Sequence, residues 1–106
     1  MARERILLVD DDLHNLSRIY LALIHRNYKV EACDKPDEIS ARIKRFKPLL
    51  IILNSLEYES IKKKLKIPAI VIEKANTDAI KLNDGDVQLR KPVEISTLIK
   101  AVRKLV

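Results

Sequence analysis

The chain has 106 residues, of which 47% are apolar, and its formal net charge is +6 with a sequence pI near 9.6. This length supports a single domain over residues 1–106 with one hydrophobic core. No apolar run reaches the roughly 18 residues that a membrane-spanning helix needs, so we expect no membrane segment.

Cysteine usage indicates the compartment. The single cysteine, Cys33, cannot form an internal disulfide, which favours a reducing cytoplasm. The segment Met1–Arg5 leads directly into an apolar strand and lacks the h-region of a signal peptide. We therefore expect a cytoplasmic protein in which Cys33 is a small buried residue.

Apolar strands alternate with helical segments from the start of the chain. The first strand is expected over Arg5–Asp10, and a helix over Asp12–His25 follows, capped by Asp11 or Asp12. The apolar positions of this helix recur at helical spacing. They are Leu13, Leu16, Tyr20, Leu23 and Ile24.

The middle of the chain continues this alternation. A short second strand is expected over Lys29–Ala32, and Pro36 suits the first turn of the next helix. The apolar stripe of that helix is Ile39, Ile43 and Phe46. The third strand, Leu49–Leu53, is apolar at every position, which is typical of a strand that is buried on both faces.

The rest of the chain predicts two more strands with helical segments around them. In order, the elements are a short helix around Glu57–Leu65, a strand over Ala69–Ile72, a helical turn near Thr77–Leu82, a strand over Val87–Leu89 and a helix over Glu94–Leu105. We expect the dense charge run Lys62–Lys66 to be a solvated helix face.

Five strands that alternate with helices imply an α/β fold with a doubly wound parallel sheet, because parallel neighbours need crossover connections. Such sheets bind ligands beyond the carboxyl ends of their strands, where the strand order reverses. The polar residues at or just past those strand ends are Asp10, Asp11, Asn54, Glu73 and Lys91.

Four stretches of the chain carry a resemblance to a known family. They are Ile6–Asp12, Pro48–Asn54, Pro68–Ile72 and Leu89–Pro92 with the helix that follows. In this order they resemble the receiver domain of bacterial response regulators in two-component phosphorelay systems. The resemblance covers the whole chain and implies a flavodoxin-like (βα)5 fold, a five-stranded parallel sheet with strand order 2-1-3-4-5.

The resemblance implies a role for each matched residue. Asp10 and Asp11 match the acidic pair that holds Mg²⁺, and the carbonyl group of Leu56 matches the backbone ligand of that ion. Lys91 matches the lysine that pairs with the acceptor carboxylate and later with the phosphoryl oxygens. The Lys91–Pro92 bond matches a peptide bond that is often cis in the family.

Three residues depart from the family pattern. Asn54 occupies the phosphoacceptor position, and a neutral amide cannot act as the carboxylate nucleophile that forms an acyl phosphate. Loss of that carboxylate also predicts weak Mg²⁺ binding and no required cofactor. Glu73 replaces the hydroxyl residue that binds the phosphoryl group, and Gln88 replaces the aromatic switch residue. Both drift and selection for a phosphate-independent role would alter the switch in this way.

Each assignment has a simpler structural alternative. Asp10–Asp12 can serve only as a helix cap, and Glu73 can be an ordinary surface charge. For Asn54 the favoured state is a polar strand end that is hydrogen-bonded to Lys91.

The leading interpretation is a degenerate receiver, or pseudo-receiver, that is not an enzyme and acts through protein contacts. Its partner would be a kinase, an effector domain or a regulator, and a homodimer remains open. By resemblance, the contact surface includes the short fourth helix, the fifth strand and the last helix. Its basic residues would be Lys81, Arg90, Lys100 and Arg103.

Two other functions compete with this interpretation. The spacing of Asp10 and Asp12 also fits a small Asp-dependent phosphatase of the haloacid dehalogenase type. However, Leu13 and His14 follow where that family has small or hydroxyl residues. The positive charge permits a nucleic-acid-binding domain, yet there is no helix-turn-helix pattern, and only three Tyr and one Phe are available to stack on bases. We therefore do not expect direct nucleic-acid binding.

Overall fold

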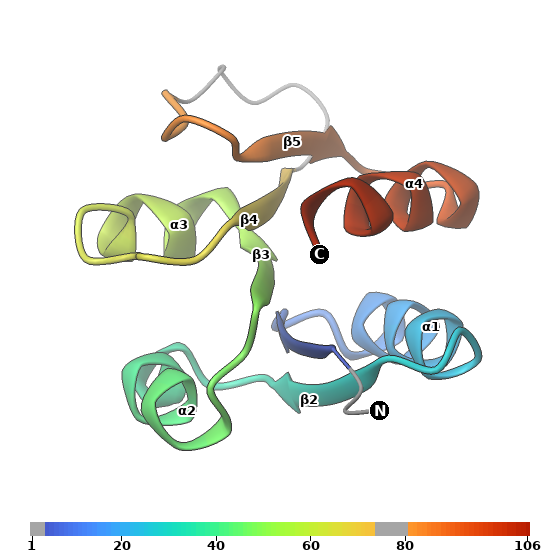
Figure 1. Ribbon diagram of the computed structural model, residues 1–106, viewed down its shortest axis with the longest axis horizontal. Coiled ribbons are helices and arrows are strands. Elements are labelled where there is room, and N and C mark those ends of the chain that lie inside the picture. Colours follow the sequence, from blue (N-terminus) through green and yellow to red (C-terminus); the bar gives the residue numbers. More distant parts are fainter. Residues whose placement is uncertain (1–3, 74–80) are drawn as a thin grey trace.

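The computed structural model describes residues 4–73 and 81–106. It shows a five-stranded sheet between two helical layers, with α1 and α4 on one face and α2 and α3 on the other (Figure 1). The strands are β1 (Arg5–Val9), β2 (Lys29–Cys33), β3 (Leu50–Asn54), β4 (Ala69–Glu73) and β5 (Val87–Arg90). The helices are α1 (Leu13–Ile24), α2 (Ile39–Phe46), α3 (Ser55–Ile61) and α4 (Ile95–Leu105), and a 3₁₀ turn, η1 (Pro36–Glu38), precedes α2.

The strand order is β2-β1-β3-β4-β5, and every neighbouring pair is parallel. This confirms the predicted fold class and strand order. The chain leaves β1 for β2 on one side and then returns to place β3 on the other, so the order reverses at the β1–β3 boundary. The carboxyl ends of β1, β3 and β4 therefore meet at one edge of the sheet, where α/β folds form their binding sites.

Two hydrophobic clusters fill the two faces of the sheet, because successive strand residues point to opposite sides. Ile6 and Leu8 of β1 pack in the cluster beneath α1 and α4, which also contains Ile19 and Leu98. The second cluster lies beneath α2 and α3 and includes Leu7, Val9, Cys33, Ile39 and Tyr58. Burial of Cys33 in this cluster confirms the prediction for that residue.

The amino end of α1 corrects one predicted apolar position. Asp12 is the N-cap, since its Oδ1 accepts hydrogen bonds from the backbone N–H groups of His14 and Asn15. Leu13 is the first helical residue and is 61% exposed, so its predicted burial is wrong. The buried stripe instead begins at Asn15 and continues with Leu16, Ile19 and Leu23.

Several predicted boundaries also shift. Leu49 precedes β3 and is exposed, whereas Asn54 is the last residue of that strand. Pro36 begins the 3₁₀ turn rather than α2. Helix α3 ends at Ile61, so residues 62–64 form a turn rather than the predicted helix face, although Lys63 and Lys64 are exposed. The helical turn predicted near Thr77–Leu82 lies mostly outside the described residues.

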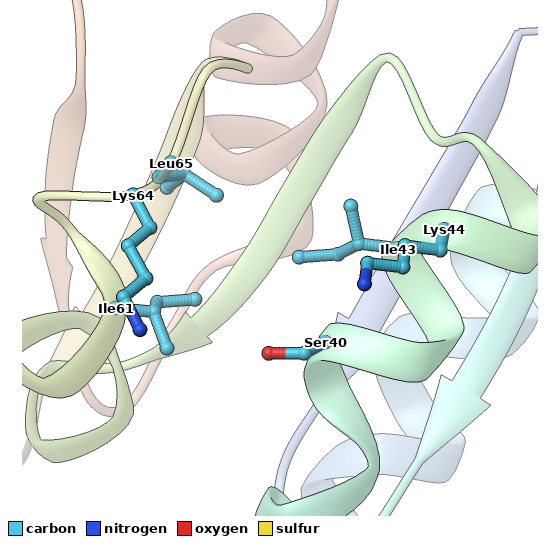
Figure 2. A pocket seen from close by; sticks show the side chains of 6 residues that line it. All are labelled: Ser40, Ile43, Lys44, Ile61, Lys64 and Leu65. Atoms are coloured by element: carbon cyan, nitrogen blue, oxygen red, sulfur yellow. The ribbon is translucent and has the colours of Figure 1, made fainter.

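Helices α2 and α3 leave part of the second cluster uncovered. Ile43 of α2 and Ile61 of α3 pack against the cluster but are only partly buried (Figure 2). The two helices have only 8 and 7 residues, which limits how much of the sheet they cover. Within the described residues, no helix combines the length and the apolar character needed to cross a membrane.

A buried tyrosine joins α3 to the segment before β5. The hydroxyl group of Tyr58 donates a hydrogen bond to Asp86 Oδ2 at 2.7 Å and accepts one from the backbone N–H of Asn83 at 2.7 Å. Asp86 Oδ1 in turn accepts a hydrogen bond from the backbone N–H of Ala69 at 3.0 Å, at the start of β4. Three elements are thus held together through one hydroxyl and one carboxylate.

We predict that Tyr58→Phe lowers the free energy of unfolding by about 1–3 kcal/mol, because it removes both hydrogen bonds of the hydroxyl group. Urea denaturation measures the change. Tyr20→Phe is the matched control, since Tyr20 is half-buried on the opposite face of the sheet. Equal losses in the two variants would contradict the role given to the Tyr58 hydroxyl.

The hydroxyl group of Tyr58 also makes the stability of the fold depend on pH. Burial raises the pKa of Tyr58 from 10.0 to about 12; the hydrogen bond from Asn83 opposes the rise and Asp86 adds to it. Because the folded-state pKa is above the unfolded value, the contribution of Tyr58 to stability is complete below pH 10.0 and is lost as the pH rises toward 12. We predict a late step in the tyrosinate absorbance of the folded protein that Tyr58→Phe abolishes.

Candidate functional site

The carboxyl ends of β1, β3 and β4 border a pocket of about 230 Å³. It brings together five of the residues predicted from the sequence, namely Asp11, Asn54, Leu56, Glu73 and Lys91, and adds Ser55 and Ile72 to its lining. The parallel sheet explains this convergence, since these residues lie at or just past strand ends at the same edge. Asp10, Gln88 and Pro92 do not line the pocket.

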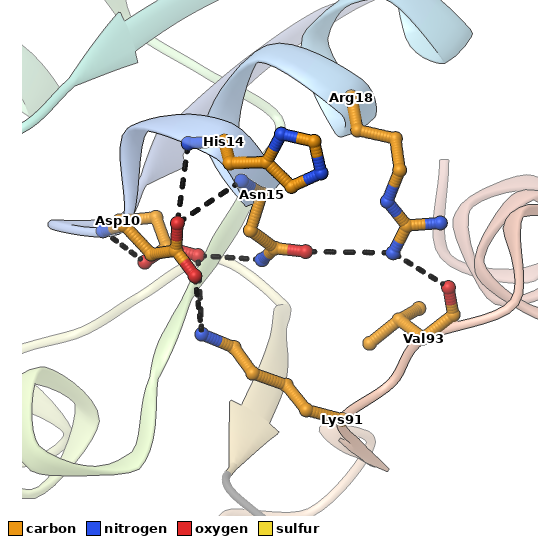
Figure 3. Close-up of polar contacts among 7 residues, drawn as sticks. Asp10, His14, Asn15, Arg18, Lys91 and Val93 are labelled. Atoms are coloured by element: carbon orange, nitrogen blue, oxygen red, sulfur yellow. Dashed lines mark hydrogen bonds and ion pairs between the residues drawn. The ribbon is translucent and has the colours of Figure 1, made fainter.

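Asp10 lies beside this pocket and is buried within a hydrogen-bond network (Figure 3). Its Oδ1 accepts a hydrogen bond from the backbone N–H of Asp12 at 2.9 Å, and its Oδ2 accepts one from Asn15 Nδ2 at 2.7 Å. Lys91 Nζ lies 3.8 Å from Asp10 Oδ2 and 3.9 Å from Asp12 Oδ2. The lysine ammonium group is therefore held between two carboxylates on the β1–α1 side of the site.

The network extends from Asn15 to the connection between β5 and α4. Arg18 Nη2 donates hydrogen bonds to Asn15 Oδ1 at 3.4 Å and to the carbonyl oxygen of Val93 at 2.8 Å. Asn15 therefore uses its amide group for Asp10 and its carbonyl oxygen for Arg18. The sequence analysis missed Asn15 and Arg18. A polar residue on the same helical stripe as Leu16 and Ile19 was the signal that could have identified Asn15.

Asn54 caps α3. Its Oδ1 accepts a hydrogen bond from the backbone N–H of Glu57 at 2.8 Å, which satisfies one free donor at the start of the helix. The predicted hydrogen bond between Asn54 and Lys91 is wrong, because no such bond joins them in the described part of the chain. Lys91 lies instead against Asp10 and Asp12, since a carboxylate attracts an ammonium group more strongly than a neutral amide does.

Glu73 places a second acidic group in the pocket. Its side chain is 0% exposed, so the alternative of an ordinary surface charge is wrong. Arg90, its neighbour across the β4–β5 pair, has Nε 3.3 Å from Glu73 Oε1. Within the ranges 4–73 and 81–106, neither carboxylate oxygen of Glu73 makes a hydrogen bond. Burial of a carboxylate with so few partners costs free energy.

The donor set fits a magnesium ion poorly. Both oxygens of Asp10 already accept hydrogen bonds, and Asn54 Oδ1 is occupied by the N–H of Glu57. Asp11 is exposed, and the Leu56 residue is exposed as well. Among the residues that the structure describes, no three His, Cys, Asp or Glu side chains gather closely enough to hold a metal ion.

Two further predicted positions lie in or after β5. Gln88 is half-buried in the middle of the strand opposite Val71, and its Nε2 is buried without a hydrogen-bond partner in the described segments. The Lys91–Pro92 peptide bond is cis, as the family resemblance implied.

The surroundings of Asp10 disfavour the phosphatase alternative. Asp10 would be the nucleophile of such an enzyme, but its carboxylate is buried and both of its oxygens accept hydrogen bonds.

Comparison with known proteins identifies the fold through solved structures rather than through sequence matches. The sequence matches no family model. No curated protein sequence matches it either. A response regulator structure from Chloroflexus aurantiacus superimposes with a TM-score of 0.84 at 20% identity, and 98% of each chain is covered. A CheY-like receiver domain protein from Methanospirillum hungatei gives 0.80 at 22% identity, with 97% of this chain and 93% of that chain covered.

A third structure, the N-terminal domain of the nisin resistance regulator, has a TM-score of 0.79 and 24% identity over 98% of both chains. Because the match extends over nearly the whole of each chain, these likenesses show that the described sheet and helices adopt the fold of receiver domains. They confirm the strand order and the flavodoxin-like architecture predicted from the sequence.

We predict that Asn15→Ala lowers the free energy of unfolding by about 1–3 kcal/mol, because it deprives the buried carboxylate of Asp10 of a hydrogen-bond donor. Chemical denaturation measures the difference. Ser17→Ala is the matched control on an exposed position of the same helix, and it should change stability by no more than about 0.5 kcal/mol. An Asn15→Ala variant as stable as Ser17→Ala would show that Asp10 does not depend on this amide.

Proposed function

We propose that this protein is a receiver-like module of two-component signal transduction that does not accept a phosphoryl group and acts through contacts with another protein. The observation that carries the proposal is the state of Asn54 within a receiver fold. The residue that ends β3 is an amide, and its oxygen caps α3. The fold and the comparisons support a signalling role, and the chemistry of the pocket supports independence from phosphate.

Acyl phosphate formation needs a free carboxylate that attacks phosphorus. Asn54 offers none, and the oxygens of Asp10 are taken up by Asp12 and Asn15. Asp11 is the exposed carboxylate of the pocket, yet a phosphoryl group there would lie close to other negative charge. The ammonium group of Lys91, which would offset that charge, is already held by Asp10 and Asp12.

Glu73 supports the same conclusion through electrostatics. Its carboxylate is fully buried and lines the pocket, so an incoming phosphoryl group would meet a like charge in a region of low dielectric constant. The one cation that the described contacts give Glu73 is Arg90, whose side chain is 60% exposed. A pocket of this composition disfavours a second anion rather than recruiting one.

Exposed basic residues offer a surface for partner proteins. The basic residues that the family resemblance assigns to the contact surface are all exposed in the structure; they are Lys81, Arg90, Lys100 and Arg103. Arg90 ends β5, Lys100 and Arg103 lie on α4, and Lys81 lies in the segment before β5. Such a surface fits an acidic face on a kinase, an effector domain or another regulator, because complementary charge accelerates and orients association.

We predict that Mg²⁺ binds more weakly to this protein than to its Asn54→Asp variant, by about tenfold, since the variant adds one carboxylate to the pocket. Isothermal titration calorimetry compares the two proteins at the same ionic strength. Asn54→Ser is a useful control, because it retains a helix-capping oxygen without adding charge. Equal affinities for the natural protein and Asn54→Asp would contradict the prediction, because the amide would then not weaken Mg²⁺ binding.

We predict that incubation with acetyl phosphate leaves no acyl phosphate on the natural protein. Intact-mass analysis of freshly purified protein is the measurement, with Asn54→Asp treated in parallel as the positive control. A gain of one phosphoryl mass that is lost in mild base and maps to Asn54, Asp10 or Asp11 would overturn the proposal. Fresh protein is needed because slow deamidation of Asn54, which precedes Ser55, would itself create an aspartate.

Treatment of Asn54→Asp with acetyl phosphate also tests whether phosphorylation can change the conformation of this fold. We expect Asn54→Asp to accept some phosphate but to show little conformational change. A ligand shifts a conformation only through contacts that differ between two states, and Glu73 and Gln88 stand where the family has the residues that make those contacts. Backbone amide chemical shifts of β5 and α4 report the change, and large shifts on phosphorylation would contradict this expectation.

A further inference from the structure

Helices α2 and α3 cover the sheet face opposite α1 and α4 (Figure 1). A groove of about 310 Å³ lies between them (Figure 2). Three aliphatic side chains and three polar ones line it: Ile43, Ile61, Leu65, Ser40, Lys44 and Lys64. It is separate from the pocket at the strand ends, since the two share no lining residue.

The aliphatic residues of the groove are the outer part of a hydrophobic cluster. Ile43, Ile61 and Leu65 pack against the second core cluster, but all three remain partly exposed. Helix α3 ends at Ile61, and Leu65 lies beyond the turn that follows it. A concave site with an apolar floor and a few polar groups at its rim is the usual form of a ligand-binding or peptide-binding site.

The rim of the groove is basic. Lys44 and Lys64 approach it from opposite sides, as Figure 2 shows, and both are exposed. Neither forms an ion pair within the described segments, whereas the neighbouring cations Arg42 and Lys62 are paired with glutamates. The lining contains no acidic residue. Four more exposed cations lie close by in the sequence: Arg45, Lys47, Lys63 and Lys66.

We propose that this groove binds an acidic segment of a partner protein. An apolar side chain of the segment would insert between Ile43 and Ile61, and flanking carboxylates would pair with Lys44 and Lys64. Charge complementarity favours this occupant over a second copy of the chain, because the copies share a net charge of +6. The aliphatic floor disfavours nucleic acid, which gains affinity from phosphate contacts and aromatic stacking.

This inference rests on the proposed role in protein contact, but it does not involve residue 54. A phosphorylated natural protein would overturn the proposed function and leave the groove untouched, whereas a groove that binds nothing would leave the chemistry of Asn54 unchanged. The two proposals can therefore fail separately.

A library of displayed helical peptides with random surface positions tests the groove without assuming a sequence. The full chain is the target, and the affinity of each enriched peptide is measured by fluorescence anisotropy. The test variant is Lys44→Glu with Lys64→Glu. The matched control is Lys29→Glu with Lys104→Glu, which changes the net charge equally at exposed positions outside the groove. Circular dichroism verifies that both variants are folded.

We expect the enriched peptides to combine acidic residues with one or two large apolar residues. They should bind about tenfold more weakly to the Lys44→Glu/Lys64→Glu variant, because the new glutamates at the rim repel the carboxylates of the peptide. They should keep most of their affinity for the control, whose substitutions lie outside the groove. Methyl chemical shifts of Ile43, Ile61 and Leu65 should change on peptide binding. Ile61→Ala, which keeps both rim lysines, should weaken binding as well.

Four results would overturn the proposal. They are enrichment of basic or uncharged peptides, equal losses in the test and control variants, shifts confined to methyl groups outside the groove, and no enrichment at all. Two further occupants are tested directly. Duplex DNA or single-stranded RNA that shifts the same methyl groups, or a dimer in sedimentation that the test variant abolishes, would assign the groove to nucleic acid or to a second copy.

Discussion

Burial of the Asp10 carboxylate is the constraint on which the site depends. Removing a carboxylate from water costs several kcal/mol unless donors and cations replace the lost water. Two hydrogen-bond donors lie just after Asp10 in the chain, the backbone N–H of Asp12 and the amide of Asn15, and the cation is the distant Lys91, ion-paired with Asp10 at 3.8 Å. Satisfying this one charge therefore fixes the start of α1 against β1 and holds the segment after β5 beside them. Arg18 extends the same network to the carbonyl oxygen of Val93.

This constraint also determines what the rest of the pocket can do. Lys91 lies between Asp10 and Asp12, so its charge is used on the β1–α1 side of the pocket. Asn54 carries no charge that would draw the lysine across, and its oxygen accepts a hydrogen bond from its own helix. Glu73 and Arg90 form a second charge pair at the ends of β4 and β5. Beside the pocket, Lys91 is thus ion-paired with Asp10 and Asp12, whereas Glu73, which is ion-paired with Arg90, has no hydrogen bond within the described ranges. Asn54 places an amide at the end of β3, where phosphotransfer would require a nucleophile.

The sequence predicted the fold well because its information is local and repetitive. Apolar runs separated by helical stripes define a parallel sheet, and parallel strands necessarily bring their carboxyl ends to one edge. That reasoning correctly gathered Asp11, Asn54, Glu73 and Lys91 around one pocket. The pairing within the pocket was not predictable in the same way, because it depends on competition among groups that are far apart in the sequence. Lys91 could pair with Asn54 or with two carboxylates, and only the structure shows that both carboxylates, in the connection between β1 and α1, lie 3.8 and 3.9 Å from its ammonium group.

Burial of individual side chains was the other point at which sequence reasoning failed. Leu13 occupies an apolar position of the predicted stripe, yet it follows directly on the capping residue and faces solvent. For Glu73 the sequence left open both a place in the site and an ordinary surface charge; as the last residue of β4, a strand that is buried at every position, it is buried. In both cases the position of one residue at the boundary of an element decided the outcome, and boundaries are the least certain feature of a hydrophobic pattern.

Phosphorus NMR of the natural protein with acetyl phosphate and Mg²⁺ tests the central claim most directly, because it detects a protein-bound acyl phosphate while the fold is intact. If the amide of Asn54 and the pairing of Lys91 with Asp10 and Asp12 close the site to phosphotransfer, the spectrum will contain only acetyl phosphate and inorganic phosphate. A protein-bound acyl phosphate resonance in the natural protein, comparable to that of Asn54→Asp, would contradict the account.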